Sequence, residues 1–193
     1  AYSIRAFASI VQENGVDNIL VARQKEFNDL ANPAFWYSLA TGLLAAVLML
    51  VSAPLAAKAF DAPKLIDLIL IIAIAAPFDA LGIVPRAALS KDFRFGTAAI
   101  INTGSLTGQM LLSVSFAAFG FGAQSFVLPL LIVNPIRALI LFILTRPPIK
   151  LVAQIKRWRS LMGQSGLLVF TAICNRAIQH GDYLILGVMY STE

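Results

Sequence analysis

Long runs of uncharged residues divide the sequence into segments that are each long enough to cross a membrane. The first run extends from Leu30 to Ala57, and a second, from Lys64 to Arg86, contains Asp79. A third run, from Phe95 to Ile136, has no charge over 42 residues, and a last apolar segment covers 161–188. About 20 apolar residues suffice to cross the hydrocarbon core as a helix. The pattern therefore predicts an all-α, polytopic transmembrane helix bundle.

Proline and glycine residues indicate where these segments bend or turn. Pro77, Gly82 and Pro85 fall inside the second run, which we therefore expect to be a kinked or broken helix. The third run is about twice the length of one crossing, and its glycine-rich stretch 119–124 predicts a tight turn that divides it into two helices. The second of these helices continues to Leu144.

The two ends of the sequence predict a fragment. The chain begins at Ala1 without a start methionine or a basic region before an apolar stretch, so no secretory signal is expected. It stops at Glu193, directly after an apolar segment. We expect a piece of a longer protein, in which Val16 to Ala22 form the end of a helix that starts before residue 1.

Composition supports the membrane prediction and excludes several soluble classes. Hydrophobic residues make up 59% of the chain and charged residues 13%, against about 45–50% and about 25% in typical globular domains. The net charge of +5 comes from basic residues in short segments between apolar runs, which does not predict a nucleic-acid-binding face. One cysteine, Cys174, cannot form an intramolecular disulfide framework, and the single histidine cannot build a zinc site.

Lysine and arginine are distributed unevenly between the predicted loops. Ten lie on one side of the predicted bundle: Arg23, Lys25, Arg86, Lys91, Arg94 and five in the linker 146–160. Only Lys58 and Lys64 lie on the other side. Since cytoplasmic loops are enriched in basic residues, the linker side is predicted to be cytoplasmic. The amphipathic middle of the linker, 151–158, is expected to lie along the membrane surface.

Charged residues at membrane depth are the candidate functional residues. Placing a charged side chain in the hydrocarbon core costs free energy, so such residues usually have a function. The substrate-binding candidates are Arg137, Arg176, Arg5, Asp182, His180 and Asp79. Arg137 precedes Arg146 by nine residues, which places it about 13 Å inside the cytoplasmic edge. Arg176 follows Leu161 by 15 residues, or about 22 Å. The sequence has no phosphate-binding glycine loop, metal-ligand spacing or nucleophile elbow, so we expect no enzyme, no metal and no cofactor.

Each candidate also has a structural interpretation. Arg137 can extend its guanidinium to the inner headgroups, and Asp79 can satisfy backbone groups at the Pro77 kink. Asp182 can pair with Arg176 or His180 or cap a helix end, and His180 can be an interface residue.

Several short strings, taken in order, resemble a known family. Gly15 to Arg23 (GVDNILVAR), followed by Phe35-Trp36-Tyr37, is similar to the end of the second helix and the start of the third in polysaccharide transporters. The further matches are Pro85 to Phe95, the glycine turn Phe119 to Gly122, and Asp182 to Gly187. Asp17 and Asn18 depart from the small residues of that pattern, and 176–182 is more polar than in it. The sequence thus resembles the O-antigen and colanic-acid type flippases, in the superfamily of multidrug and toxin extrusion antiporters.

The resemblance implies a fragment of a two-lobe transporter of about twelve helices. Residues 1–145 would form the N-terminal lobe from helix two to helix six, 146–160 the cytoplasmic linker, and 161–193 the first helix of the second lobe. It implies transport of a polyprenyl-pyrophosphate-linked oligosaccharide across the bacterial inner membrane by alternating access, in polysaccharide biosynthesis and export. A polysaccharide polymerase and glycosyltransferases are the further implied partners. An ion-coupled drug extruder of the same superfamily and a non-transporting membrane scaffold are the alternatives.

Overall fold

The computed structural model describes residues 16–59, 65–149 and 158, and all the regular elements in these ranges are helices. They are α2 (Val16–Ala22), η1 (Gln24–Glu26), α3 (Phe27–Ala59), α4 (Leu65–Leu81), α5 (Ile83–Lys91), α6 (Phe95–Ala118), η2 (Gly122–Phe126) and α7 (Leu128–Thr145). The predicted amphipathic linker helix and the last predicted span lie outside the described residues, apart from Trp158.

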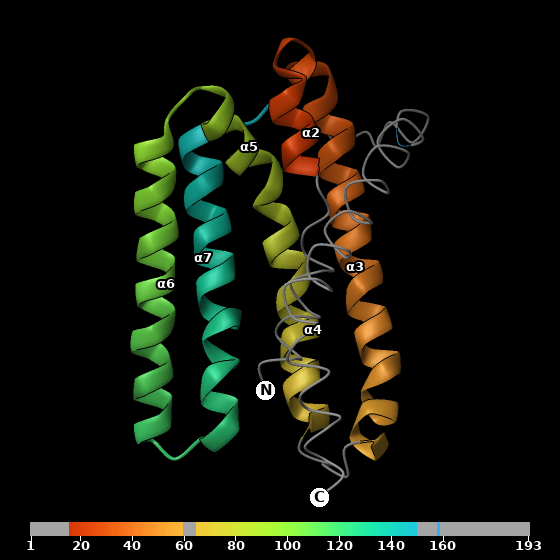
Figure 1. The fold of residues 1–193 in the computed structure, drawn as a ribbon, viewed down its shortest axis with the longest axis vertical. Coiled ribbons are helices and arrows are strands. Elements are labelled where there is room, and N and C mark those ends of the chain that lie inside the picture. The colour runs from red at the N-terminus through yellow and green to blue at the C-terminus, as the bar shows by residue number, and fades with distance from the viewer. Residues whose placement is uncertain (1–15, 60–64, 150–157, 159–193) are drawn as a thin grey trace, which may run out of the picture.

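The long helices run up and down side by side in the order α6, α7, α4 and α3 (Figure 1). Three stretches are long and apolar enough to cross a membrane: Gln24–Leu55, Leu65–Lys91 and Gly122–Thr145. The prediction of an all-α polytopic bundle is therefore confirmed. Helix α6 forms within the predicted third run, with 24 residues, but it is not among the three stretches that meet the apolar criterion.

The second predicted span is broken where the sequence indicated. Gly82 separates α4 from α5, and its amide donates to the carbonyl of Asp79 at 3.0 Å, one residue short of the α-helical partner. The amide of Arg86 then donates to the Gly82 carbonyl at 3.1 Å, which starts the new helix. The prediction that Arg86 lies at the loop end of this span is wrong, because α5 continues to Lys91. Buried side chains on both sides of Arg86, including Val84 and Ala87, keep this segment helical.

The glycine turn predicted at 119–124 is also confirmed. Gly120 has φ +85° and Gly122 has φ +57°, backbone conformations that residues with a Cβ rarely adopt. The amide of Gly120 donates to the Ala117 carbonyl at 3.0 Å and ends α6. The turn reverses the chain so that α7 returns alongside α6.

Small residues line the contact between α3 and α4. Gly42 of α3 lies so near α4 that a Cβ added to it would be 2.7 Å from the Cβ of Ala80. The other small buried residues on the two helices are Ala31, Ala34, Ser38, Ala45, Ala46, Ala53, Ala57, Ala73, Ala75 and Ala76. Close backbone approach through small residues is how helices associate in lipid, where there is no hydrophobic driving force between them.

The outer surface of the bundle is apolar. Leu48, Val51 and Leu55 of α3 are each at least 60% exposed, as are Leu139 and Ile143 of α7. A soluble monomer rarely exposes such continuous apolar surface, so these faces are suited to contact lipid tails.

The aromatic residues Phe35, Trp36 and Tyr37, which the family resemblance placed at the start of a helix, lie further inside α3, which begins at Phe27. The rings of Phe35 and Phe142 are 5.8 Å apart edge to face, so Phe35 links α3 to α7. Tyr37 contacts Trp158, with ring centroids 6.0 Å apart. Two of these three rings therefore pack between segments of the protein.

Candidate functional site

An ion pair joins two of the predicted candidates within the membrane-spanning helices. Nη1 of Arg137, on α7, lies 3.8 Å from Oδ1 of Asp79, on α4. The two side chains are only 19% and 18% exposed. Arg137 lies eight residues before the end of α7 at Thr145, or about 12 Å along the helix axis. The structure thus pairs Arg137 with an acid inside the bundle, which a side chain extended to the headgroups would not achieve.

Arg86 belongs to the same cluster, although its place in the sequence predicted a loop cation. Its positive charge acts on Arg137, and its Nε atom is buried with no hydrogen-bond partner in the described part of the chain. Asp79 and Arg86 are seven residues apart but lie in different helices, α4 and α5, on either side of the break at Gly82, so helical spacing alone does not bring them together.

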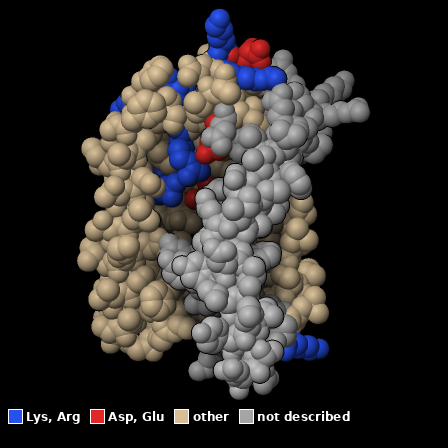
Figure 2. All heavy atoms as spheres, viewed as in Figure 1, with Lys and Arg blue, Asp and Glu red and all other residues tan. Residues whose placement is uncertain are grey.

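The cluster of Asp79, Arg86 and Arg137 has one negative and two positive charges. Among the described residues no carboxylate forms an ion pair with Arg86. Figure 2 shows basic and acidic atoms together in a recess of the face in view, below the basic side chains at the upper end. In a low-dielectric site, the excess positive charge favours an anion strongly. Guanidinium groups present paired donors that match phosphate oxygens.

Uncharged polar side chains are also buried in the bundle. Asn134 is buried on α7, one turn before Arg137. Ser38 is fully buried in α3, and its Oγ has no hydrogen-bond partner among the described residues. The interior of this bundle is therefore not uniformly apolar.

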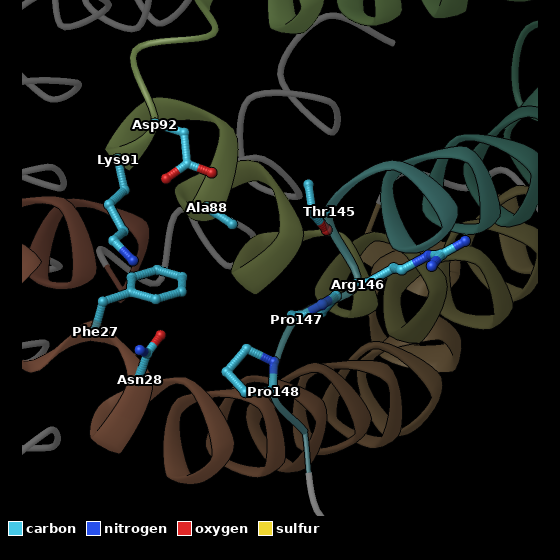
Figure 3. A pocket seen from close by; sticks show the side chains of 9 residues that line it. All are labelled: Phe27, Asn28, Ala88, Lys91, Asp92, Thr145, Arg146, Pro147 and Pro148. Atoms are coloured by element: carbon cyan, nitrogen blue, oxygen red, sulfur yellow. The ribbon is translucent and has the colours of Figure 1, made fainter.

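A separate cavity of about 360 Å³ opens where the ends of α3, α5 and α7 meet. It is lined by Phe27, Asn28, Ala88, Lys91, Asp92, Thr145, Arg146, Pro147 and Pro148. Nζ of Lys91 lies 4.7 Å from the centroid of the Phe27 ring, and Figure 3 shows Arg146 extending away from the cavity. The cavity lies at the end of the bundle and its Asp92 is exposed, so charges there are screened by solvent more than those of the buried cluster are.

Basic residues of the described loops gather at the end of the bundle that includes this cavity. Arg23 and Lys25 follow α2, Lys91 and Arg94 flank the α5–α6 turn, and Arg146 follows α7, all at the upper end of Figure 1. Lys58 lies at the opposite end of α3. This is the asymmetry that the sequence predicted for these loops.

The other predicted candidates, Arg5, Arg176, His180 and Asp182, lie outside the described residues, as does Cys174. Of the six, the structure therefore brings together Arg137 and Asp79. Within the described ranges no group of three metal-binding side chains is present.

One comparison with known proteins gives a match. The family model described as "Polysaccharide biosynthesis protein" matches the chain over residues 1–193. No curated protein and no solved structure is significantly similar to it. The match covers every helix described above, including those that carry the charged cluster, and it agrees with the resemblance to polysaccharide transporters seen in the sequence. This all-α membrane chain therefore belongs to the polysaccharide biosynthesis protein family.

Proposed function

We propose that the protein is a flippase that moves a polyprenyl-pyrophosphate-linked oligosaccharide across the bacterial inner membrane. The family match supports a role in polysaccharide biosynthesis, and the apolar helices support a place in the bilayer. The observation that carries the proposal is the cluster of Arg86, Arg137 and Asp79, which has excess positive charge inside membrane-spanning helices.

In this proposal the two arginines bind the pyrophosphate. Arg86 has no acidic partner among the described residues, so it is available to an anionic ligand. Arg137 is held by Asp79, at a distance of 3.8 Å that is longer than an ideal charge-assisted hydrogen bond. A pyrophosphate can therefore compete with Asp79 for the same guanidinium. The net charge disfavours an extruder of cationic drugs, which needs an excess of acids here.

Transport by alternating access needs two lobes that move against each other around such a site. We assign residues 1–145 to the N-terminal lobe, 146–160 to a cytoplasmic linker and 161–193 to the first helix of a second lobe. The end of α7 at Thr145, followed by Pro147 and Pro148, supports the first of these boundaries. The N-terminal lobe then provides the arginines, and the second lobe closes over the ligand.

The test is export of the polysaccharide in cells that depend on this gene, normalised to the level of the protein in the membrane. Arg86→Ala should reduce normalised export at least about tenfold, since a charge-assisted hydrogen bond contributes about 1.5–3 kcal/mol. Arg86→Lys should restore part of the export, because it keeps the charge and loses the planar fork. The matched control is Arg94→Ala, which removes an exposed arginine at the end of the bundle. Full normalised export by both Arg86→Ala and Arg137→Ala would refute the cationic site.

A further inference from the structure

Helix α6 differs in chemistry from the other long helices. Between Phe95 and Ala118 it has no charged residue but eight hydroxyl or amide side chains. These are Thr97, Asn102, Thr103, Ser105, Thr107, Gln109, Ser113 and Ser115. None of its residues is fully buried among the described parts of the chain. A helix at membrane depth with this many polar groups requires partners for them, because unsatisfied polar groups in lipid are costly.

Two amides of α6 have no such partner in the described bundle. Ser105 and Ser115 donate to carbonyls of their own helix, Ile101 and Leu111. Asn102 and Gln109 have no side-chain hydrogen bond to another described residue. Asn102 is exposed and Gln109 is half-buried. Each amide offers two donors and one acceptor oxygen, so together they form the largest unused hydrogen-bonding capacity on α6.

Asn102, Gln109 and Ser113 lie on one face of the helix, which we call the polar stripe. Their spacing of seven and four residues keeps them within about 40° of one another, at about 100° per residue. The half-buried Ala98, Ser105 and Leu112 lie at the centre of the half-buried face of α6, and α7 is the long helix that packs against α6. The polar stripe is turned about 60° from that face. It therefore flanks the α6–α7 contact rather than facing directly away from the protein.

The handedness of the helix decides which flank this is. In Figure 1, α6 descends from the α5 end of the bundle with α7 on its right. The polar stripe follows the α7 face in the sense in which the chain winds around the helix axis. In a right-handed helix that descends with α7 on its right, residues rotated in this sense from the α7 face point toward the viewer. This is the face on which Figure 2 shows charged atoms in a recess. Arg137 lies about 12 Å below the upper end of α7, and Asn102 lies about 10 Å below the upper end of α6.

We infer that the polar stripe of α6 binds the neutral sugar residues of the transported lipid, beside the arginines that bind its pyrophosphate. The inference rests on the proposed function and adds a separate glycan site to it. Starting at the depth of Arg137, the stripe runs on to Ser113, about 27 Å below the upper end of α6. Sugar hydroxyls donate and accept hydrogen bonds and carry no charge. The amide and hydroxyl groups of the stripe have the same properties. A charged ligand segment would require opposite charges, and α6 has none.

The decisive experiment compares two probes on the purified full chain in lipid nanodiscs. One probe is polyprenyl pyrophosphate with its oligosaccharide, isolated from host membranes, and the other is polyprenyl pyrophosphate without sugar. Asn102→Ala/Gln109→Ala should weaken binding of the sugar-bearing lipid about tenfold, because each lost hydrogen bond costs a factor of several. It should leave binding of the bare lipid unchanged. The matched control, Thr103→Ala/Thr107→Ala, removes two exposed polar residues from a different face and should change neither affinity.

The outcomes separate the glycan site from the proposed function. Unchanged binding of both lipids by the amide variant would overturn the glycan site and leave the flippase intact. The glycan site is also overturned if the amide variant weakens both lipids equally, since its role is then structural. If the wild-type protein binds neither lipid, the proposed function itself fails.

A second measurement covers the case in which the amide variant does not accumulate. A photoreactive benzoylphenylalanine at position 109 should crosslink to radiolabelled glycan, whereas the same residue at position 107 should not. Equal labelling at both positions, or labelling at 107 alone, would overturn the glycan site. Crosslinks from 109 to protein instead of glycan would show that another protein segment covers the stripe. This result would also overturn the glycan site.

Discussion

Arg137 and Asp79 are held together across the contact of α7 and α4, with Nη1 3.8 Å from Oδ1 and both side chains less than 20% exposed. Asp79 lies three residues before Gly82, where the chain leaves α4 and starts α5. The ion pair therefore ties α7 to a point next to the break in its neighbour. A change at either residue is expected to affect the other.

The first prediction concerns this coupling. Arg137→Ala removes a charge from membrane depth, but it also leaves the carboxylate of Asp79 without its partner, and the reverse holds for Asp79→Ala. The double variant Asp79→Ala/Arg137→Ala should therefore be more stable than the sum of the two single effects predicts. A double-mutant cycle on thermal unfolding in detergent should give a coupling of about 0.5–3 kcal/mol. Strictly additive effects would show that the two charges do not interact.

The second prediction tests the close contact of α3 and α4. Gly42→Ala should destabilise the protein by about 1–3 kcal/mol, because the new Cβ would be 2.7 Å from the Cβ of Ala80. Adding Ala80→Gly should recover much of the loss. Gly104→Ala is the control, since a Cβ there meets no atom within 4 Å, and alanine favours a helix over glycine. Equal unfolding temperatures for Gly42→Ala and Gly104→Ala would contradict the packing.

The helices and their breaks were largely predictable from the sequence. Uncharged length identified the spans, because lipid-spanning segments must be long and apolar. Gly82 identified the break in the second span because glycine is a weak helix former. The Gly120–Gly122 turn identified the end of α6 because glycine adopts positive φ without strain. What the sequence did not locate was the end of α5. Its charged residue Arg86 resembles a loop residue in a hydropathy pattern, and only the packing of its neighbours keeps it in a helix.

The charged cluster was only half predictable for a related reason. Depth along a helix identified Arg137 and Asp79, since it depends on residue count alone. Their pairing, and the proximity of Arg86, depend on how α4, α5 and α7 are rotated against one another. Helix α4 is apolar on nearly all sides, so its sequence pattern gives little information about rotation. The partners of Arg137 therefore had to come from the structure.

The third prediction concerns the turn between α6 and α7. Gly120→Ala and Gly122→Ala should each destabilise the protein by about 1–2 kcal/mol, because a Cβ is disfavoured at φ +85° and φ +57°. The cost is conformational rather than steric, since a Cβ added at either position would meet no atom within 4 Å. Asn should be tolerated better than Ala at both sites, because it adopts this conformation more readily. A similar loss for Asn and Ala, measured by thermal unfolding, would argue against the turn conformation.

The last prediction concerns which end of the bundle faces the cytoplasm. The described basic loops gather at one end, and basic loops are retained on the cytoplasmic side. In a Cys174→Ser background, a cysteine replacing the exposed Arg94 should resist a membrane-impermeant thiol reagent in intact cells. A cysteine replacing the exposed Ala123, in the turn at the opposite end, should react. Both should react after the cells are permeabilised, which controls for buried thiols. The two positions flank α6, since Arg94 lies directly before it and Ala123 lies in η2 after it. Labelling of 94 but not 123 would therefore reverse the orientation of the described bundle. Labelling of both in intact cells would show that α6 does not cross the membrane.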